Sequence, residues 1–308
     1  MKLAFLFPGQ GSQSVGMGKD IYDNSDFAKK RFDKANEILG RDIKNIIFEG
    51  PDEILKSTEN TQPALFLVES IVCDLLKQNG IVPTYTMGHS LGEYSALYAS
   101  EVFDFATGIE LVAKRGELMA WAGKKSKGAM AAILGMEKDK IISLLLEVKN
   151  GVVVSANENS PEQLVISGDE TAVASACEIL KAGGAKRAIM LPVSGAFHSP
   201  LMKPAADEFQ KFLAGKTFNN AKYPVITNVR AMAETSGEAV KSLLIEQLLS
   251  PVRWVDCQRE LFNLGIKDAI EVGPGNVLKG LMKKTVEEFS VANCANYENI
   301  ISVVEQYK

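Results

Sequence analysis

Histidine and cysteine are scarce in this chain of 308 residues, which has two histidines and four cysteines. No C-x-x-C pair and no neighbouring histidine accompanies the cysteines, which stand at Cys73, Cys177, Cys257 and Cys294. This spacing suits neither a zinc site nor a disulfide framework, so we expect no metal site. If the chain carries out acid–base chemistry at neutral pH, His89 and His198 are its natural bases.

The chain also lacks a large charge of one sign, long apolar runs and internal repeats. A net charge of −4 argues against a nucleic-acid surface as its main business. The apolar stretch at residues 3–7 is too short for a signal peptide, and no run is long enough to span a membrane. We therefore expect a cytoplasmic monomer that binds neither nucleic acid nor membrane.

Segments with the apolar pattern of a strand alternate along the chain with segments that have the apolar pattern of a helix, and the hydrophobic content is 46%. Expected strands at residues 3–7 and 82–87 alternate with helices, and further strands are expected at 224–227 and 267–271. The helices are expected at residues 26–39, 63–78, 91–98 and 105–121. Alternation of this kind predicts an α/β fold with a parallel sheet.

A polar, glycine-flanked segment at residues 123–128 reads as a hinge. The elements expected after it run in the order β-α-β-β-α-β, which is the ferredoxin-like pattern. They are expected at residues 129–134, 138–149, 152–156, 163–167, 170–182 and 186–191. We therefore predict a large α/β-hydrolase-like domain made of residues 1–124 and 194–308, and an inserted ferredoxin-like subdomain at 125–193.

A G-x-S-x-G pentapeptide, Gly88-His89-Ser90-Leu91-Gly92, stands where an expected strand turns into a helix. A serine at such an elbow is held on a strained corner, and its neighbour's N–H lies at the helix N-terminus. Ser90 is thus the candidate nucleophile. A purely structural turn would have the same sequence.

His198 is the candidate base, because His89 is too close in sequence to point easily at Ser90. Ser199 and Pro200 read as the N-cap and first residue of a helix, which places His198 at the end of a loop. Scaffolds often present catalytic groups at loop ends. A capping or packing role is the alternative.

Arg115 interrupts the apolar stripe of the helix expected at residues 105–121. The stripe consists of Leu111, Val112, Leu118, Met119 and Ala122. An arginine on a buried face needs an anion, and its planar fork suits a carboxylate. The anion is either a substrate or an internal Asp or Glu, unless the side chain snorkels to a rim.

The glycine-rich segment at residues 8–14 follows a strand but fits no phosphate loop. A dinucleotide fingerprint needs glycine where Ser14 stands, and no Walker lysine follows. Its backbone N–H groups are candidates for an oxyanion hole together with that of Leu91. A plain turn is the alternative.

Together these motifs resemble the malonyl-CoA:acyl carrier protein transacylases of fatty acid synthesis, nearly end to end. The motifs are Phe7-Pro8-Gly9-Gln10-Gly11-Ser12-Gln13, Gly88-His89-Ser90-Leu91-Gly92-Glu93, Arg115, Phe197-His198, Glu246-Gln247-Leu248 and Glu271-Val272-Gly273-Pro274-Gly275. The resemblance implies that Ser90 attacks a malonyl thioester with His198 as base, oriented by the backbone carbonyl of Gln247. It further implies an oxyanion hole formed by Gln10 and Leu91, and a malonyl carboxylate held by Arg115.

The resemblance also implies which residues line the substrate pocket and which acyl group the pocket prefers. His89, Met119, Asn157 and Phe197 would line the pocket, and Phe197 is typical of malonyl-selective relatives. The turn expected at residues 157–161 would help to close the pocket.

The expected substrates are malonyl-CoA and an acyl carrier protein that carries a phosphopantetheine thiol, with no cofactor. That protein is acidic, so a basic rim is expected, with Lys186, Arg187, Lys283 and Lys284 as candidates or merely solvated charges.

Two other functions remain open on the sequence. A serine esterase or thioesterase of the α/β-hydrolase type shares the elbow but needs an acid between serine and histidine. A carrier-protein-binding module without activity is the second.

Overall fold

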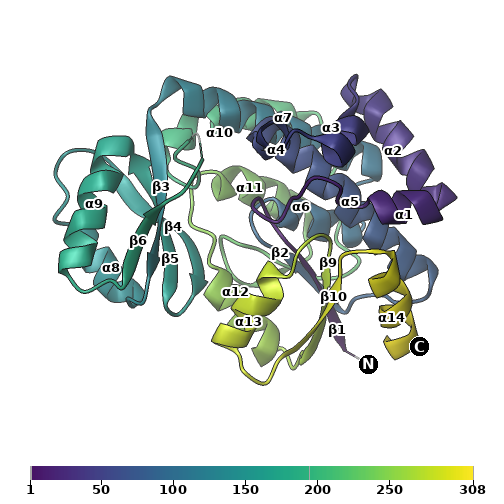
Figure 1. The fold of residues 1–308 in the computed structure, drawn as a ribbon. Helices are drawn as coiled ribbons and strands as arrows, with labels where there is room; N and C mark the ends of the chain where they lie inside the picture. Colours follow the sequence, from purple (N-terminus) through teal and green to yellow (C-terminus); the bar gives the residue numbers. More distant parts are fainter. Residues whose placement is uncertain (1, 194, 308) are drawn as a thin grey trace.

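The computed structural model describes residues 2–193 and 195–307, which form a six-stranded and a four-stranded sheet (Figure 1). Residues 1, 194 and 308, which are ends of the predicted domains, lie outside the described residues. The six-stranded sheet has the order β10-β9-β1-β2-β7-β8, and only the edge strand β8 pairs antiparallel. Its strands are β1 (Leu3–Phe7), β2 (Tyr85–Gly88), β7 (Val225–Ile226), β8 (Ala233–Glu234), β9 (Asp268–Val272) and β10 (Ser290–Cys294). The predicted α/β fold with a parallel sheet is confirmed.

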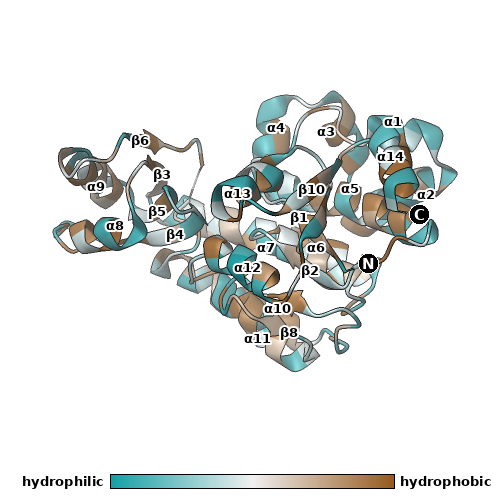
Figure 2. Cartoon of the chain, turned by 90° about the horizontal axis from the view of Figure 1, so that it is seen from below, coloured by the Kyte–Doolittle hydropathy of each residue, from teal (hydrophilic) through white to brown (hydrophobic). Residues whose placement is uncertain are grey.

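Both faces of the large sheet are covered, and β1 lies at its centre (Figures 1 and 2). Phe5 and Phe7 join the core formed with α5, α6 and α7, whereas Ala4 and Leu6 join the core formed with α12 and α13. A strand buried on both faces reads as a continuous apolar run. The helices named here are α5 (Thr58–Gln78), α6 (Gly92–Ala99), α7 (Phe105–Lys125), α12 (Trp254–Asn263) and α13 (Val277–Thr285).

The other helices pack around this frame. They are α1 (Lys19–Asn24), α2 (Asp26–Leu39), α3 (Ile43–Glu49), α4 (Asp52–Lys56), η1 (Pro200–Met202), α10 (Lys203–Ala214), α11 (Gly237–Gln247) and α14 (Tyr297–Tyr307). Among the helices described, none has both the length and the apolar character needed to cross a bilayer.

The four-stranded sheet lies to one side of the large one in both views (Figures 1 and 2). Its elements occur in the predicted order: β3 (Gly128–Leu134), α8 (Lys138–Leu145), β4 (Val153–Ser160), β5 (Gln163–Asp169), α9 (Glu170–Ala182) and β6 (Arg187–Met190). The sheet order is β4-β5-β3-β6, and every pair is antiparallel. Val252, which precedes α12, exchanges backbone hydrogen bonds with Ala156 and Glu158 of β4 at 2.8 and 2.9 Å. The small sheet is thereby joined to the segment between α11 and α12.

Besides the start of α5, described below, four expected boundaries are wrong by three or four residues. Helix α7 continues to Lys125, so the first part of the expected hinge is helical. Strand β2 begins at Tyr85 rather than at 82, because Val82 is exposed and Pro83 cannot donate a ladder hydrogen bond. Helix α8 ends at Leu145 rather than at 149. Strand β4 reaches Ser160, so the turn expected at 157–161 is mostly strand.

Helix α5 begins at Thr58, five residues before the expected start at Pro63. A proline inside a helix frees the carbonyl four residues earlier, which here is that of Glu59. The guanidinium of Arg41 donates to this carbonyl at 2.7 Å. A distant side chain therefore compensates the break that the local sequence predicts.

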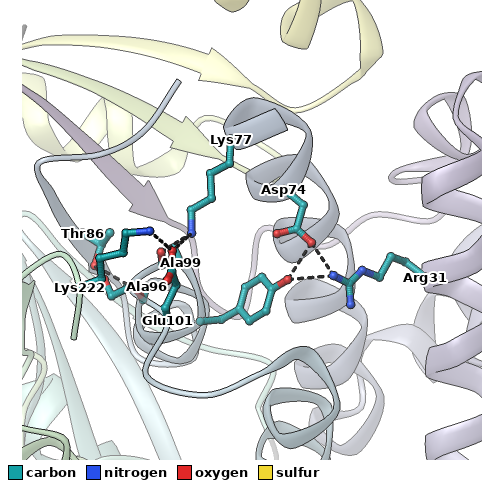
Figure 3. A network of polar contacts seen from close by, with 10 residues as sticks. Arg31, Asp74, Lys77, Thr86, Ala96, Ala99, Glu101 and Lys222 are labelled. Carbon is teal, nitrogen blue, oxygen red and sulfur yellow. Dashed lines mark hydrogen bonds and ion pairs between the residues drawn. The ribbon is translucent and has the colours of Figure 1, made fainter. Parts of the chain in front are cut away.

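A polar network fixes the far end of α6, the helix that begins at the elbow (Figure 3). Tyr98 donates to Asp74 at 2.7 Å, and Arg31 pairs with the same carboxylate oxygen at 2.8 Å. Lys77 donates to the carbonyl of Ala99 at 2.5 Å. Three helices, α2, α5 and α6, are thus linked through buried and half-buried polar groups.

Candidate active site

Ser90 lies on a tight elbow between β2 and α6, at the edge where the parallel strands end. Its φ of 52° is left-handed, as a strained corner requires. A Cβ on Gly88 would lie 2.0 Å from the backbone of Gly92, and one on Gly92 would lie 2.1 Å from the carbonyl of Phe7. Only glycine permits this approach of strand, helix and β1, so the predicted strand-turn-helix geometry is confirmed.

His198 meets Ser90 directly, across 108 positions of sequence. Its Nε2 lies 2.8 Å from Ser90 Oγ, and its Nδ1 lies 2.8 Å from the backbone carbonyl of Gln247. A carbonyl can only accept, so Nδ1 carries the proton and the lone pair of Nε2 faces the hydroxyl. Burial, reinforced by the charge of Arg115, lowers the pKa of His198 to about 3. The imidazole is therefore neutral at neutral pH, with the Nε2 lone pair directed at the Ser90 hydroxyl.

Ser199 caps the short helix after His198, as predicted, by accepting from Leu201 N–H. The helix is a 3₁₀ turn, η1, that leads into α10. His198 itself has a φ of 56°. The histidine thus lies at the end of a loop that its own cap holds in place.

Arg115 is buried, with 1% of its surface exposed. Its Nη1 donates to Gln62 Oε1 at 2.9 Å, and its Nη2 donates to Gln247 Oε1 at 3.0 Å and to Ser90 Oγ at 3.1 Å. Among the described residues it forms no ion pair with Asp or Glu. Burial lowers the pKa of Arg115. Of the alternatives open on the sequence, an internal ion pair and snorkelling both disagree with this structure.

Two backbone N–H groups are free to serve as oxyanion donors. Within the described part of the chain, neither Gln10 N–H nor Leu91 N–H donates to a protein acceptor. The carbonyl of Ser90 accepts from Gln247 Nε2 at 3.0 Å. Because the peptide unit is planar, this bond turns the Leu91 N–H to the opposite side. The hydroxyl of Thr58 donates to Oε1 of the Gln10 side chain at 2.5 Å.

A cavity of about 250 Å³ connects these groups, with walls from the small sheet on one side and from the loops after β1 and β2 and helices α7 and α13 on the other. All four predicted pocket residues line it, namely His89, Met119, Asn157 and Phe197. Asn157 does so from strand β4 and not from a turn. His89 Nε2 lies 2.8 Å from Asn159 Oδ1, which also lines the cavity. His89 therefore joins the elbow to the small sheet.

Three of the four predicted rim residues come together. Lys186, Arg187 and Lys284 line a hollow of about 520 Å³, although they come from the small sheet and from α13. Gln163 lines both this hollow and the cavity at Ser90, so the two adjoin. Lys283 is exposed on α13 and does not line the hollow.

Four buried polar side chains that the sequence analysis did not single out shape the site. They are Gln62, Glu93, Asn228 and the side chain of Gln247. Gln247 falls on the apolar stripe of α11 with Val240, Leu243 and Leu244, the signal that revealed Arg115. Burial raises the pKa of Glu93 to about 7. Asn228 lies in a loop after β7, where no periodicity marks it.

A strained serine beside a neutral histidine, at the strand ends of an α/β sheet, defines the class of enzymes that move acyl groups. A model of the acyl transferase domain family matches residues 4–304. A malonyl CoA-acyl carrier protein transacylase of Bacillus subtilis is 45% identical over 309 residues, which cover 100% of this chain and 98% of that protein.

Solved structures of similar sequence point to the same family. An acyl carrier protein S-malonyltransferase from Vibrio cholerae matches with a TM-score of 0.95 at 43% identity, covering 98% of this chain and 100% of that one. A malonyl-transacylase in complex with its type II PKS acyl-carrier protein matches with a TM-score of 0.96 at 39% identity, covering 99% and 100%. The chain belongs to the acyl transferase domain family, and the protein is an acyltransferase. The resemblance to malonyl-CoA:acyl carrier protein transacylases is confirmed.

Proposed function

We propose that the protein transfers the malonyl group of malonyl-CoA to the phosphopantetheine thiol of an acyl carrier protein for fatty acid biosynthesis. The relatives' names support the substrate pair. The observation that carries the proposal is the position of Ser90 Oγ, 2.8 Å from His198 Nε2 and 3.1 Å from Arg115 Nη2. One oxygen thus meets both a base and a guanidinium that, among the described residues, forms no ion pair with a carboxylate.

In the first half-reaction, Ser90 Oγ attacks the thioester carbonyl while His198 Nε2 takes its proton. The developing oxyanion accepts from Gln10 and Leu91 N–H, which are already oriented. When the intermediate collapses, the C–S bond breaks and His198 returns the proton to the coenzyme A sulfur. The products are a malonyl ester of Ser90 and free coenzyme A.

In the second half-reaction, the carrier-protein thiol takes the place of coenzyme A. His198 removes the thiol proton, the sulfur attacks the ester, and the proton passes to Ser90 Oγ as the C–O bond breaks. This scheme is a ping-pong reaction with a Ser–His dyad. Every step is assigned to a side chain or a backbone N–H of this chain, so it requires no cofactor.

Arg115 selects a diacid in this scheme. An acyl group with a free carboxylate gives the buried guanidinium a charged acceptor, whereas with an acetyl group its acceptors among the described residues are the neutral oxygens of Gln62, Gln247 and Ser90. Phe197 and Met119 narrow the cavity beside the acyl group. This supports malonyl in preference to bulkier methylmalonyl.

We also propose the division into domains. The antiparallel order β4-β5-β3-β6, with α8 and α9 sharing one core with the sheet, supports a ferredoxin-like unit at residues 125–193. Residues 1–124 and 194–308 then form the α/β-hydrolase-like domain that carries Ser90 and His198. The cavity, lined by the small sheet on one side and by loops and helices around the large sheet on the other, supports an active site between two domains.

The carrier protein docks, in this proposal, on the basic hollow beside the cavity. Lys186, Arg187 and Lys284 supply positive charge at the place where a phosphopantetheine arm would enter. Lys283 is a weaker candidate because it lies outside the hollow. The proposed enzyme acts as a monomer.

Hydrolysis is the competing outcome. An esterase triad requires an acid on His198 Nδ1, and that atom instead meets a backbone carbonyl. The test supplies malonyl-CoA with and without phosphopantetheinylated carrier protein. We expect malonyl on the carrier thiol, with hydrolysis much slower than transfer. Rapid hydrolysis without transfer would establish a thioesterase, and the absence of both reactions would establish a binding module.

A further inference from the structure

Asn228 is a buried polar side chain that the proposed mechanism does not use, yet it contacts the nucleophile's turn on both sides. Its side chain is 0% exposed and reaches Ser90 from 138 positions away. Its Oδ1 accepts from Ser90 N–H at 2.7 Å, and its Nδ2 donates to the Gly88 carbonyl at 2.7 Å. One amide therefore bridges the two flanks of the elbow.

The amide has only one orientation that makes both contacts. A backbone N–H can only donate and a carbonyl can only accept, so a flipped amide would lose both hydrogen bonds. Glu93 Oε2 accepts from the backbone N–H of Asn228 at 3.1 Å and from Gln247 Nε2 at 2.7 Å. The buried carboxyl group thereby holds both amide-bearing residues in place.

These contacts act on a strained part of the site, the turn at Ser90. A serine with positive φ persists only where its surroundings hold it. Asn228 fixes the Ser90 N–H, and Gln247 Nε2 fixes the Ser90 carbonyl at 3.0 Å. With both peptide groups fixed, the direction of the Ser90 Cα–Cβ bond is set, and the hydroxyl it carries lies 2.8 Å from His198 Nε2.

We propose that Asn228 is a positioning residue for the nucleophile, one that holds Ser90 in its strained conformation. The inference rests on the proposed role of Ser90. Because Asn228 does not line the cavity, its loss should slow acylation of Ser90 by any acyl donor and leave binding of the thioester intact. A residue that merely stabilised the fold would not separate rate from binding in this way.

The test compares Asn228→Ala with a matched control, Thr86→Val. Thr86 is also 0% exposed, lies in β2, and loses hydrogen bonds to Ala96 and Ser100 without touching Ser90. Acylation of Ser90 by malonyl-CoA and by acetyl-CoA is timed by quenched-flow mass spectrometry. Malonyl-CoA affinity is measured by calorimetry in a Ser90→Ala background.

We expect Asn228→Ala to slow both acylations about 100-fold, with affinity and the Thr86→Val rates changed less than about threefold. A wild-type rate in Asn228→Ala, or an equal loss in Thr86→Val, would overturn the proposal. If Asn228→Ala does not fold, Asn228→Asp replaces it. That variant keeps the acceptor for Ser90 N–H and loses the donor to Gly88, so slower acylation with intact binding is again expected.

A fluorophosphonate probe separates this inference from the proposed substrate. If wild-type Ser90 reacts with the probe but not with malonyl-CoA, the proposed function is wrong, and the probe's rates in the same variants still judge Asn228. If wild-type Ser90 reacts with neither reagent, it is no nucleophile and the inference falls with it.

Discussion

Replacing Arg115 by alanine should reduce malonyl transfer far more than acetyl transfer. The guanidinium Nη2 lies 3.1 Å from Ser90 Oγ, so an acyl group on this oxygen brings its free carboxylate within reach of the fork. A hydrogen bond to a charged group contributes about 1.5–3 kcal/mol. Taking about 3 kcal/mol for a two-pronged contact, and about 1.4 kcal/mol per tenfold in rate, the malonyl preference should fall roughly 150-fold.

The informative quantity is the ratio of the malonyl and acetyl transfer rates, because Arg115 also forms hydrogen bonds with buried side chains. Its loss leaves Gln62 Oε1 and Gln247 Oε1 without their donor, which affects both acyl groups alike. The assay is kcat/KM for transfer from malonyl-CoA and from acetyl-CoA to the carrier protein. Arg115→Lys, which keeps the charge without the fork, should give an intermediate ratio. An equal loss for both substrates would show that Arg115 is purely structural and would refute the reasoning.

Three further predictions concern the base, the scaffold and the rim. Because burial lowers the pKa of His198 to about 3, its ¹⁵N imidazole signals should stay those of the neutral ring from pH 8 down to about 5, and a titration near its ordinary value would contradict this. Because the pKa of His198 is lower in the folded protein than in the unfolded chain, protonation favours the unfolded chain. The free energy of unfolding is therefore highest above the unfolded pKa of His198 and decreases as the pH falls from there toward the folded pKa. Asp74→Ala should lower the free energy of unfolding by about 2 kcal/mol, because it leaves Arg31 and Tyr98 without their shared acceptor. The control Lys222→Ala, which removes an exposed ion pair with Glu101, should change that free energy by less than about 0.5 kcal/mol. Equal thermal unfolding of the two variants would contradict this prediction. Reversing the charges of Lys186, Arg187 and Lys284 together should raise KM for the carrier protein at least about tenfold and leave acylation by malonyl-CoA unchanged, and an unaltered KM would place the docking surface elsewhere.

The parts of the site that follow from local sequence could be predicted. The glycines around Ser90 reflect one tight crossing of strand and helix, and Arg115 interrupts an apolar stripe whose period is that of a helix. Ser199 and Pro200 mark the helix after His198 because capping is a short-range interaction. Each of these signals is contained within one element.

What could not be predicted depends on contacts between distant elements. Asn228 reaches the elbow from 138 positions away, and no pattern in its own loop distinguishes it from a surface asparagine. The start of α5 depends on Arg41, which compensates the carbonyl freed by Pro63. Lys284 joins Lys186 and Arg187 only because α13 packs beside the small sheet. Tertiary contacts of this kind override local propensity.

The central claim is that Ser90 carries the acyl group between the two thiols. Intact-mass measurement followed by peptide mapping, after mixing with malonyl-CoA, tests it directly. The account predicts one malonyl group on the peptide that contains Ser90, absent in Ser90→Ala and discharged by the carrier-protein thiol faster than by water. Transfer that proceeds without any adduct on Ser90, or an adduct on a different residue, would contradict it.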